Sequence, residues 1–218
     1  MADLQVATAP NTVRRESLSR RVFKRVMGWY MRTWHHLRVD GMEYLPPRGP
    51  ALVLCNHTSL LDVPTLMAAD PYPDTIVVVK SSMFKLPLVR QVLDAWGAIS
   101  VDRDGRDTSG VRALLSALRA GRMVAMAGEG TRSRTGRLQP INPVLAKLAV
   151  TSGVPVIPLG IVGSFEALPR GALFPRRHPI YVRVGEPFTL PRGTSPTEAA
   201  QRIQDAIAAL LPPERRPA

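Results

Sequence analysis

Residues 51–62 read Ala-Leu-Val-Leu-Cys-Asn-His-Thr-Ser-Leu-Leu-Asp and hold the clearest structural signal in the chain. The first part, Ala51–Cys55, is an uninterrupted apolar run of strand length, which is typical of a strand buried on both faces of a parallel sheet. The second part, residues 56–62, is polar and precedes a short helical stretch. Because α/β proteins build their sites where parallel strands end, we expect functional side chains in this segment.

Similar apolar runs alternate with helical stretches along most of the remaining chain. This alternation predicts an α/β fold in which a mainly parallel, mixed sheet is flanked by helices. The last helix begins after Thr194 or Ser195 as the N-cap, with Pro196 at its first position. The predicted strands cover residues 51–55, 75–80, 98–101, 122–127, 156–162 and 180–184, and the predicted helices cover residues 17–37, 63–69, 86–95, 109–120, 143–151 and 196–211.

Length and composition limit the class of protein. The chain has 218 residues, of which 45% are hydrophobic, enough for one well-covered domain, which we place at residues 41–211. We expect flexible ends at residues 1–13 and 212–218.

No apolar run approaches the ~20 residues of a membrane-spanning helix, so an integral membrane protein is not expected. The first 22 residues lack an apolar signal-peptide core, and the single cysteine, Cys55, excludes an internal disulfide or multi-thiolate zinc site. These features favour a cytoplasmic compartment.

The chain is strongly basic. Its net charge of +12 indicates an anionic partner, which could be nucleic acid, a phospholipid surface or a phosphorylated substrate. The charge alone does not choose among these partners. Residues 1–40 hold eight basic and three acidic side chains, a net charge of +5, so the basic character is concentrated at the front of the chain.

His57 and Asp62 are candidates for acid–base chemistry. A histidine can take a proton from a hydroxyl, while a carboxylate on its other nitrogen fixes the tautomer and stabilises the imidazolium. On a continuous helix, two residues five apart would lie about 140° apart, so they can meet only if the chain turns before the helix begins. The alternatives are a helix cap or capping box for Asp62 and a loop position for His57. Cys55 ends the buried run, so we expect a core residue rather than a thiol nucleophile.

Residues 128–134, Gly-Glu-Gly-Thr-Arg-Ser-Arg, form a second polar segment after a predicted strand. Glycines let the backbone approach an anion, hydroxyls donate, and Arg132 and Arg134 can grip a phosphate in a forked geometry. The segment is neither a Walker loop nor a dinucleotide fingerprint. It is either a phosphate cradle or a polar loop with solvated arginines.

Four blocks, taken together and in this order, resemble the glycerolipid acyltransferase family typified by 1-acyl-sn-glycerol-3-phosphate acyltransferase. The similarity covers residues 41–190. The chain departs from the family at two places: Ala127-Gly128 replaces Phe-Pro, and Pro140-Ile141-Asn142-Pro143 replaces a segment that often shows Lys and Gly. The matching residues are Asn56, His57 and Asp62; Lys80 and Pro87 before Gly97, Ile99, Asp102 and Arg103; Glu129 to Ser133; and Val154 to Pro158.

The resemblance implies a glycerol-3-phosphate acyltransferase-like fold and direct acyl transfer from an acyl thioester to the free hydroxyl of 1-acylglycerol-3-phosphate. His57 is then the general base and Asp62 its partner. The donor is acyl-CoA or acyl-ACP, the acyl thioester of the acyl carrier protein. No metal or other cofactor is implied. The resemblance gives substrate-binding roles to Asn56, Lys80, Arg103, Glu129, Gly130, Thr131, Arg132 and Ser133.

The basic leading segment, residues 14–40, gains a role under this interpretation. A helix with apolar and aromatic side chains on one face and arginines on the other suits an anionic membrane interface, so we expect a peripheral protein on the cytoplasmic face. The alternative is packing of Phe23, Tyr30 and Trp34 on the domain, and both can hold.

Four methionines either border an acyl-chain groove or pack in the core: Met67, Met83, Met123 and Met126.

Other functions stay open at this stage. The acceptor could be another lysolipid or a polyol, and His57 could activate water in a thioester hydrolase. Outside enzymes, the basic charge would suit a nucleic-acid-binding protein or a peripheral membrane module. No nucleic acid is expected, because the sequence has no zinc spacing and no RNP-like aromatic motif.

Overall fold

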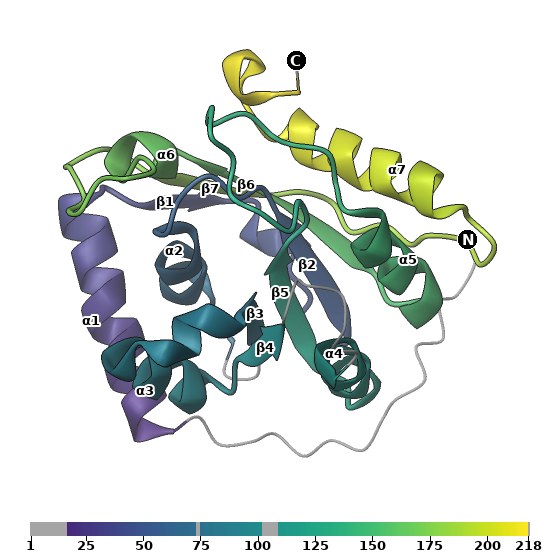
Figure 1. Ribbon diagram of the computed structural model, residues 1–218, viewed down its shortest axis with the longest axis horizontal. Coiled ribbons are helices and arrows are strands. Elements are labelled where there is room, and N and C mark those ends of the chain that lie inside the picture. Colours follow the sequence, from purple (N-terminus) through teal and green to yellow (C-terminus); the bar gives the residue numbers. More distant parts are fainter. Residues whose placement is uncertain (1–16, 73–74, 102–108, 218) are drawn as a thin grey trace.

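The computed structural model describes residues 17–72, 75–101 and 109–217, which build one seven-stranded sheet with helices on both faces (Figure 1). The strand order is β1-β7-β6-β2-β5-β3-β4. Neighbouring strands are parallel, except that β6 and β7 are antiparallel. The predicted mainly parallel, mixed sheet is confirmed. The strands are β1 (Arg38–Asp40), β2 (Ala51–Cys55), β3 (Ile76–Lys80), β4 (Ile99–Val101), β5 (Met123–Ala127), β6 (Val156–Val162) and β7 (Tyr181–Val184).

The helices form two layers. In Figure 1, α1, α2 and α3 lie on one side of the sheet, and α4, α5 and α7 lie on the other. Residues of β2 face both layers alternately, which is why all five are buried. The helices are α1 (Leu18–Trp34), α2 (Asp62–Ala69), α3 (Pro87–Trp96), α4 (Ser109–Arg119), α5 (Pro143–Ser152), α6 (Ser164–Ala167) and α7 (Pro196–Ala209), with 3-10 turns η1 (Met42–Tyr44), η2 (Ser81–Lys85) and η3 (Pro213–Arg215).

Helix starts follow the sequence signals. Ser195 is the N-cap of α7, its hydroxyl accepting a hydrogen bond from the Glu198 N–H, and Pro196 follows at the first position as predicted. Asn142 caps α5 in the same way through the Val144 N–H.

The sequence did not predict β1 or α6, because three or four residues are too short to show a period. The C-terminal segment, expected to be flexible, contacts the domain where Leu138 N–H donates to the Arg215 carbonyl.

Helix α1 has two apolar faces. One packs on the domain through Phe23, which meets the ring of Trp96 edge to face, and through the fully buried Met31. Arg20, 4% exposed, pairs with Asp70 and lies over Trp96, which fixes α1 to the end of α2. The other face exposes an apolar stripe at intervals of three and four residues: Leu18, Val22, Val26 and Trp29. Packing therefore uses one face and leaves a second, solvent-facing apolar stripe. Among the described residues, no helix is long and apolar enough to cross a membrane.

Candidate active site

The polar segment after β2 makes a turn that brings His57 and Asp62 together. Strand β2 ends at Cys55, and α2 begins only at Asp62, so residues 56–61 are free to bend. The Nδ1 atom of His57 lies 2.9 Å from Oδ2 of Asp62. The turn that a contact across five residues requires is therefore present.

A single oxygen of Asp62 organises this turn. Oδ2 accepts hydrogen bonds from the backbone N–H groups of Thr58, at 2.7 Å, and Ser59, at 2.8 Å, in addition to His57. The capping box that the sequence offered as an alternative is not formed, because the N-cap of α2 is Leu61 and the Ser59 hydroxyl accepts from the Leu61 N–H instead of the Asp62 N–H. Asp62 is 1% exposed, and its carboxylate holds the turn before α2 and the imidazole.

The contact fixes the tautomer of His57. Because a carboxylate accepts from Nδ1–H, the neutral ring carries its lone pair on Nε2, where it can take a proton from a hydroxyl. The side chain of His57 is 14% exposed, whereas that of Asp62 is 2% exposed. The imidazole of His57 is therefore partly accessible from solvent, whereas the carboxylate of Asp62 that orients it is buried.

Asn56 holds the base of the turn to the neighbouring strand. Its side-chain amide donates to the Ile161 carbonyl at 2.9 Å, and its side-chain oxygen accepts from the Ile161 N–H at 2.7 Å. Both polar atoms thus bond to the backbone of β6, and Asn56 is 2% exposed. The predicted substrate-binding residue lies beneath the site, where it fixes the end of β2.

The segment after β5 closes against the same turn. Glu129 accepts from the His57 backbone N–H at 2.9 Å, and the Ser133 N–H donates to the His57 carbonyl at 2.8 Å. Since β2 and β5 are adjacent and parallel, their ends reach the same edge of the sheet. Both backbone groups of His57 are therefore held by residues of the 128–134 segment.

The two departures from the family pattern lie in contact with each other. Gly128 carbonyl accepts from the Asn142 N–H at 3.0 Å, and a Cβ on Gly128 would lie only 2.8 Å from Cδ1 of Ile141. The Gly128 N–H also donates to the Cys55 carbonyl. The glycine makes room for Ile141, so the two unusual segments fit together and fix the turn that presents Glu129.

Comparison with known proteins decides the family. Residues 36–162 match the family profile described as Acyltransferase, and this stretch is more than half of the chain. The chain belongs to the acyltransferase family. The turn of residues 56–61 and the Glu129 segment both lie inside the matched region.

The curated relatives carry one activity in their names. The chain is 29% identical to a chloroplastic 1-acyl-sn-glycerol-3-phosphate acyltransferase of Brassica napus over 62% of this chain and 39% of that protein. It is 27% identical to the enzyme of the same name from Limnanthes douglasii over 83% of this chain and 65% of that protein. The chain thus spans between about two fifths and two thirds of the length of these acyltransferase relatives.

A solved structure shares the fold. The crystal structure of 1-acyl-sn-glycerophosphate acyltransferase from Thermotoga maritima covers 86% of this chain, with 76% of that chain matched, a TM-score of 0.74 and 24% sequence identity. This likeness confirms the expected fold, a mainly parallel, mixed sheet flanked by helices.

The remaining predicted substrate-binding residues that the structure describes lie near one edge of the sheet. Lys80 ends β3, which is parallel to β5, and is exposed. Gly130 takes a positive φ of 75°, Thr131 is exposed, and Arg132 is half-buried. Ser133 is 1% exposed and bonds through its backbone to His57. Arg103 lies outside the described residues.

Cys55 is a core residue, as the sequence suggests. It is 2% exposed, and burial, reinforced by the charges of Asp62 and Glu129, raises the pKa of its thiol well above the usual value. A raised pKa disfavours the thiolate, so Cys55 is a poor nucleophile.

Among the described residues, no cluster of three or more histidine, cysteine or carboxylate side chains could hold a metal ion.

Gln139 is a site residue that the sequence analysis missed. Its Nε2 donates to Oε2 of Glu129 at 2.9 Å and to the Thr131 carbonyl at 3.3 Å. Glu129 is 6% exposed, with one oxygen on His57 and the other on Gln139. Nothing in a single glutamine ten residues downstream signals this contact, which depends on how the 130–140 segment folds back.

The burial of Glu129 gives the stability of the protein a predictable pH dependence. Burial raises the pKa of Glu129 to about 8, against the opposing effect of the hydrogen bonds from His57 and Gln139. A folded state that binds the proton more tightly than the unfolded state loses stability as pH rises from about 4.5 to about 8. We expect Glu129→Gln to flatten the fall of Tm across this range, measured by thermal unfolding at pH 5, 6.5 and 8.

The control for this prediction is Glu186→Gln. Glu186 is exposed, so neutralising it should leave the pH dependence of Tm as in the unsubstituted protein. An equal slope in the Glu129→Gln protein and the unsubstituted protein would contradict the prediction.

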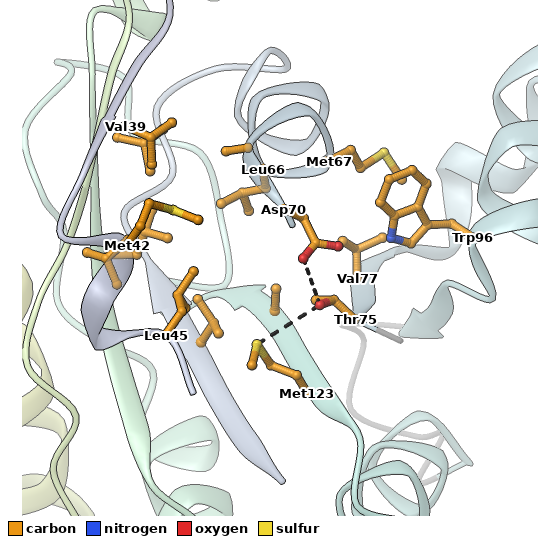
Figure 2. A pocket seen from close by; sticks show the side chains of 16 residues that line it. Val39, Met42, Leu45, Leu66, Met67, Asp70, Thr75, Val77, Trp96 and Met123 are labelled. Carbon is orange, nitrogen blue, oxygen red and sulfur yellow. Dashed lines mark hydrogen bonds between the residues drawn. The ribbon is translucent and has the colours of Figure 1, made fainter. Parts of the chain in front are cut away.

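An apolar cavity lies between α2 and the sheet (Figure 2). The space between its lining atoms, together with the solvent at its open mouth, amounts to about 470 Å³. Figure 2 shows Met42 and Trp96 on opposite sides of it, with Asp70 and Thr75 joined by a hydrogen bond. Met67 and Met123 line the cavity, and Leu159, which pairs with Cys55, reaches it from β6. The cavity therefore runs beneath the helix that begins at Asp62.

The four methionines of the sequence analysis separate in the structure. Met67 and Met123 line the cavity and belong to the core on the α2 side of the sheet, and Met83 packs against that core. Met126 packs in the core on the opposite face of the sheet. Met126 does not line the cavity that Met123 lines and fits the core alternative, because residues three apart on a strand face opposite sides.

Proposed function

We propose that this protein transfers a fatty acyl group from an acyl thioester to the free hydroxyl of 1-acylglycerol-3-phosphate, giving phosphatidic acid. The observation that carries the proposal is the contact between Nδ1 of His57 and Asp62. It lies at the edge of the sheet where β5 ends and the Glu129 segment begins. Family membership and the names of the curated relatives support it.

The proposed step needs no covalent enzyme intermediate. Nε2 of His57 takes the hydroxyl proton while the oxygen attacks the thioester carbonyl, and Asp62 stabilises the imidazolium that forms. The C–S bond then breaks, the acyl ester is complete, and the thiolate of coenzyme A or of an acyl carrier protein takes the proton from His57. General-base help of this kind contributes roughly 10²- to 10⁴-fold to the rate.

Basic side chains would hold the acceptor's phosphate. Arg132 and Lys80, at the same edge of the sheet, are candidates, with Thr131 and the Gly130 backbone as donors. The resemblance adds Arg103, which lies outside the described residues. Charge-assisted hydrogen bonds of this kind contribute about 1.5 to 3 kcal/mol each. Asn56, Glu129 and Ser133, which bond within the protein, are proposed to position His57 and the turn rather than to contact substrate. No metal or other cofactor takes part in the proposed reaction.

Helix α1 supports attachment to an anionic membrane surface. Its exposed stripe includes Val26 and Trp29, and the helix carries five basic and no acidic residues. Apolar side chains flanked by arginines suit a helix lying in a membrane interface. We propose a peripheral protein on the cytoplasmic face that meets its lysolipid acceptor there.

Acceptor dependence tests the proposed reaction. Thiol release from an acyl thioester is measured with and without lysophosphatidic acid, and the lipid product is identified by mass spectrometry. We expect release to depend on the acceptor and phosphatidic acid to form. Equal release in both would instead indicate a thioester hydrolase, and acylation of a different acceptor from a mixture would correct the substrate.

The cavity beneath α2 is proposed to receive the acyl chain. Met123 and Met126 offer a matched pair, because they are the same residue type on one strand but face opposite sides. We expect Met123→Phe to lower the kcat/KM of long acyl donors relative to short ones by about tenfold, since small changes in an apolar pocket are worth this much. Met126→Phe should leave the ratio unchanged. Equal chain-length profiles for the two variants, with matched Tm values, would contradict the assignment.

A further inference from the structure

The loop between α6 and β7 ends in an exposed apolar tip. Leu173 is 88% and Phe174 is 80% exposed. Exposed arginines stand on both sides of the tip, at Arg170, Arg176 and Arg177, and residues 169–178 contain no acidic side chain. Two adjacent large apolar side chains in full contact with water are costly for a soluble surface, and such patches usually mark an interaction site.

Both ends of this loop are fixed. At its start, the Leu168 carbonyl accepts from the hydroxyl of Ser59 at 2.9 Å, so the loop leaves directly from the turn that holds His57. At its base, the Arg176 N–H donates to the Ala167 carbonyl at 2.6 Å. The tip therefore projects from a closed base that is bonded to the candidate active site.

The far end of the loop is tied to helix α1. The His178 carbonyl lies 3.2 Å from Nδ1 of the buried His35, and Arg177 bonds to His36 at 3.0 Å. Figure 1 shows this loop beside the C-terminal end of α1. Hydrogen bonds thus link the loop that carries the apolar tip to the turn that holds His57 and to the two histidines that follow α1.

We propose that the tip, Leu173 and Phe174, inserts into an anionic lipid bilayer and holds the site of His57 at the membrane surface. The chemistry favours a bilayer, because two apolar side chains enter the acyl region while Arg170, Arg176 and Arg177 meet anionic headgroups. A patch of two side chains is small beside the ~800 Å² per partner that a stable protein–protein interface buries. The physiological purpose of this surface rests on the proposed function, but vesicle binding can be measured without it.

A fluorescent label at the tip tests the insertion directly. The only natural cysteine, Cys55, is 2% exposed, so a cysteine introduced by Phe174→Cys can be labelled selectively with an environment-sensitive dye. We expect a blue shift and rise of emission with vesicles of equimolar phosphatidylcholine and phosphatidylglycerol, and a weaker response with phosphatidylcholine alone. Val144→Cys is the matched control, because Val144 is 64% exposed on α5, in the opposite helix layer, and its label should not respond.

A second variant keeps the test independent of the label. We expect the double variant Leu173→Ser with Phe174→Ser to bind anionic vesicles at least about tenfold more weakly in flotation, with unchanged Tm. Its thiol release with detergent-dispersed lysophosphatidic acid should match the unsubstituted protein. No emission change at position 174 and unchanged flotation would overturn the proposal, and would direct the search to a protein partner for the tip. Absence of acyl transfer by every variant would instead refute the proposed function and leave the vesicle result to decide the insertion.

Discussion

Replacing His57 by alanine is expected to lower kcat for acyl transfer at least about hundredfold while leaving Tm almost unchanged. The loss follows from removing the group that would take the hydroxyl proton. The fold should survive, because the backbone bonds of His57 with Glu129 and Ser133 do not need the imidazole. Oδ2 of Asp62 would still accept from the Thr58 and Ser59 N–H groups.

Thiol release with lysophosphatidic acid and thermal unfolding, run on the same preparation, check this prediction. Added imidazole should restore part of the activity of the alanine variant, since the vacated space lies beside a carboxylate that can orient a free ring. Activity within a few-fold of the unsubstituted protein would place the base elsewhere. A large fall in Tm would show that the ring holds the turn together.

Two substitutions of Asp62 should separate its structural and chemical contributions. Asp62→Ala leaves the buried N–H groups of Thr58 and Ser59 without their acceptor, at a cost of about 1 to 3 kcal/mol each, so Tm should fall together with activity. Asp62→Asn keeps an acceptor oxygen for both groups, so Tm should remain close to that of the unsubstituted protein. It removes the negative charge that would stabilise the imidazolium, so kcat should still fall on the order of 10²-fold or more.

Asp94→Ala is the control for this pair of variants. Asp94 is an exposed carboxylate on α3 that pairs with Arg90, and exposed pairs of this kind contribute about 0.3–0.5 kcal/mol. It should change neither Tm nor kcat appreciably. An Asp62→Asn protein with full activity would show that Asp62 only holds the turn through the Thr58 and Ser59 N–H groups and has no chemical role.

Much of the fold could be predicted because it depends on local signals. The apolar run at Ala51–Cys55 forms the central strand β2, and Ser195 with Pro196 begins the last helix. The short strand β1 could not be predicted, since it exists only through pairing with residues near position 181, more than 140 residues later. A three-residue strand carries too little pattern of its own.

The same division runs through the candidate site. The spacing of His57 and Asp62 required a turn before the helix, and the turn is there. The sequence could not show that Asn56 and Glu129 direct their polar atoms into the protein, because that depends on Ile161 and Gln139. It also could not show that Ile141 occupies the space beside Gly128.

The sequence by itself determined the order of the strands and helices other than β1 and α6, the chemical types at the two polar segments, and the basic character of the leading helix. These properties depend on residue type and on spacing within a few positions. Only the tertiary structure decided which polar groups face the solvent and which hold the turn, and that the loop carrying the Leu173–Phe174 tip is bonded through its Leu168 carbonyl to the same turn as His57. Burial and hydrogen bonding between distant segments set those outcomes, because a side chain's partners are fixed only when the parallel strands align and bring their ends to one edge.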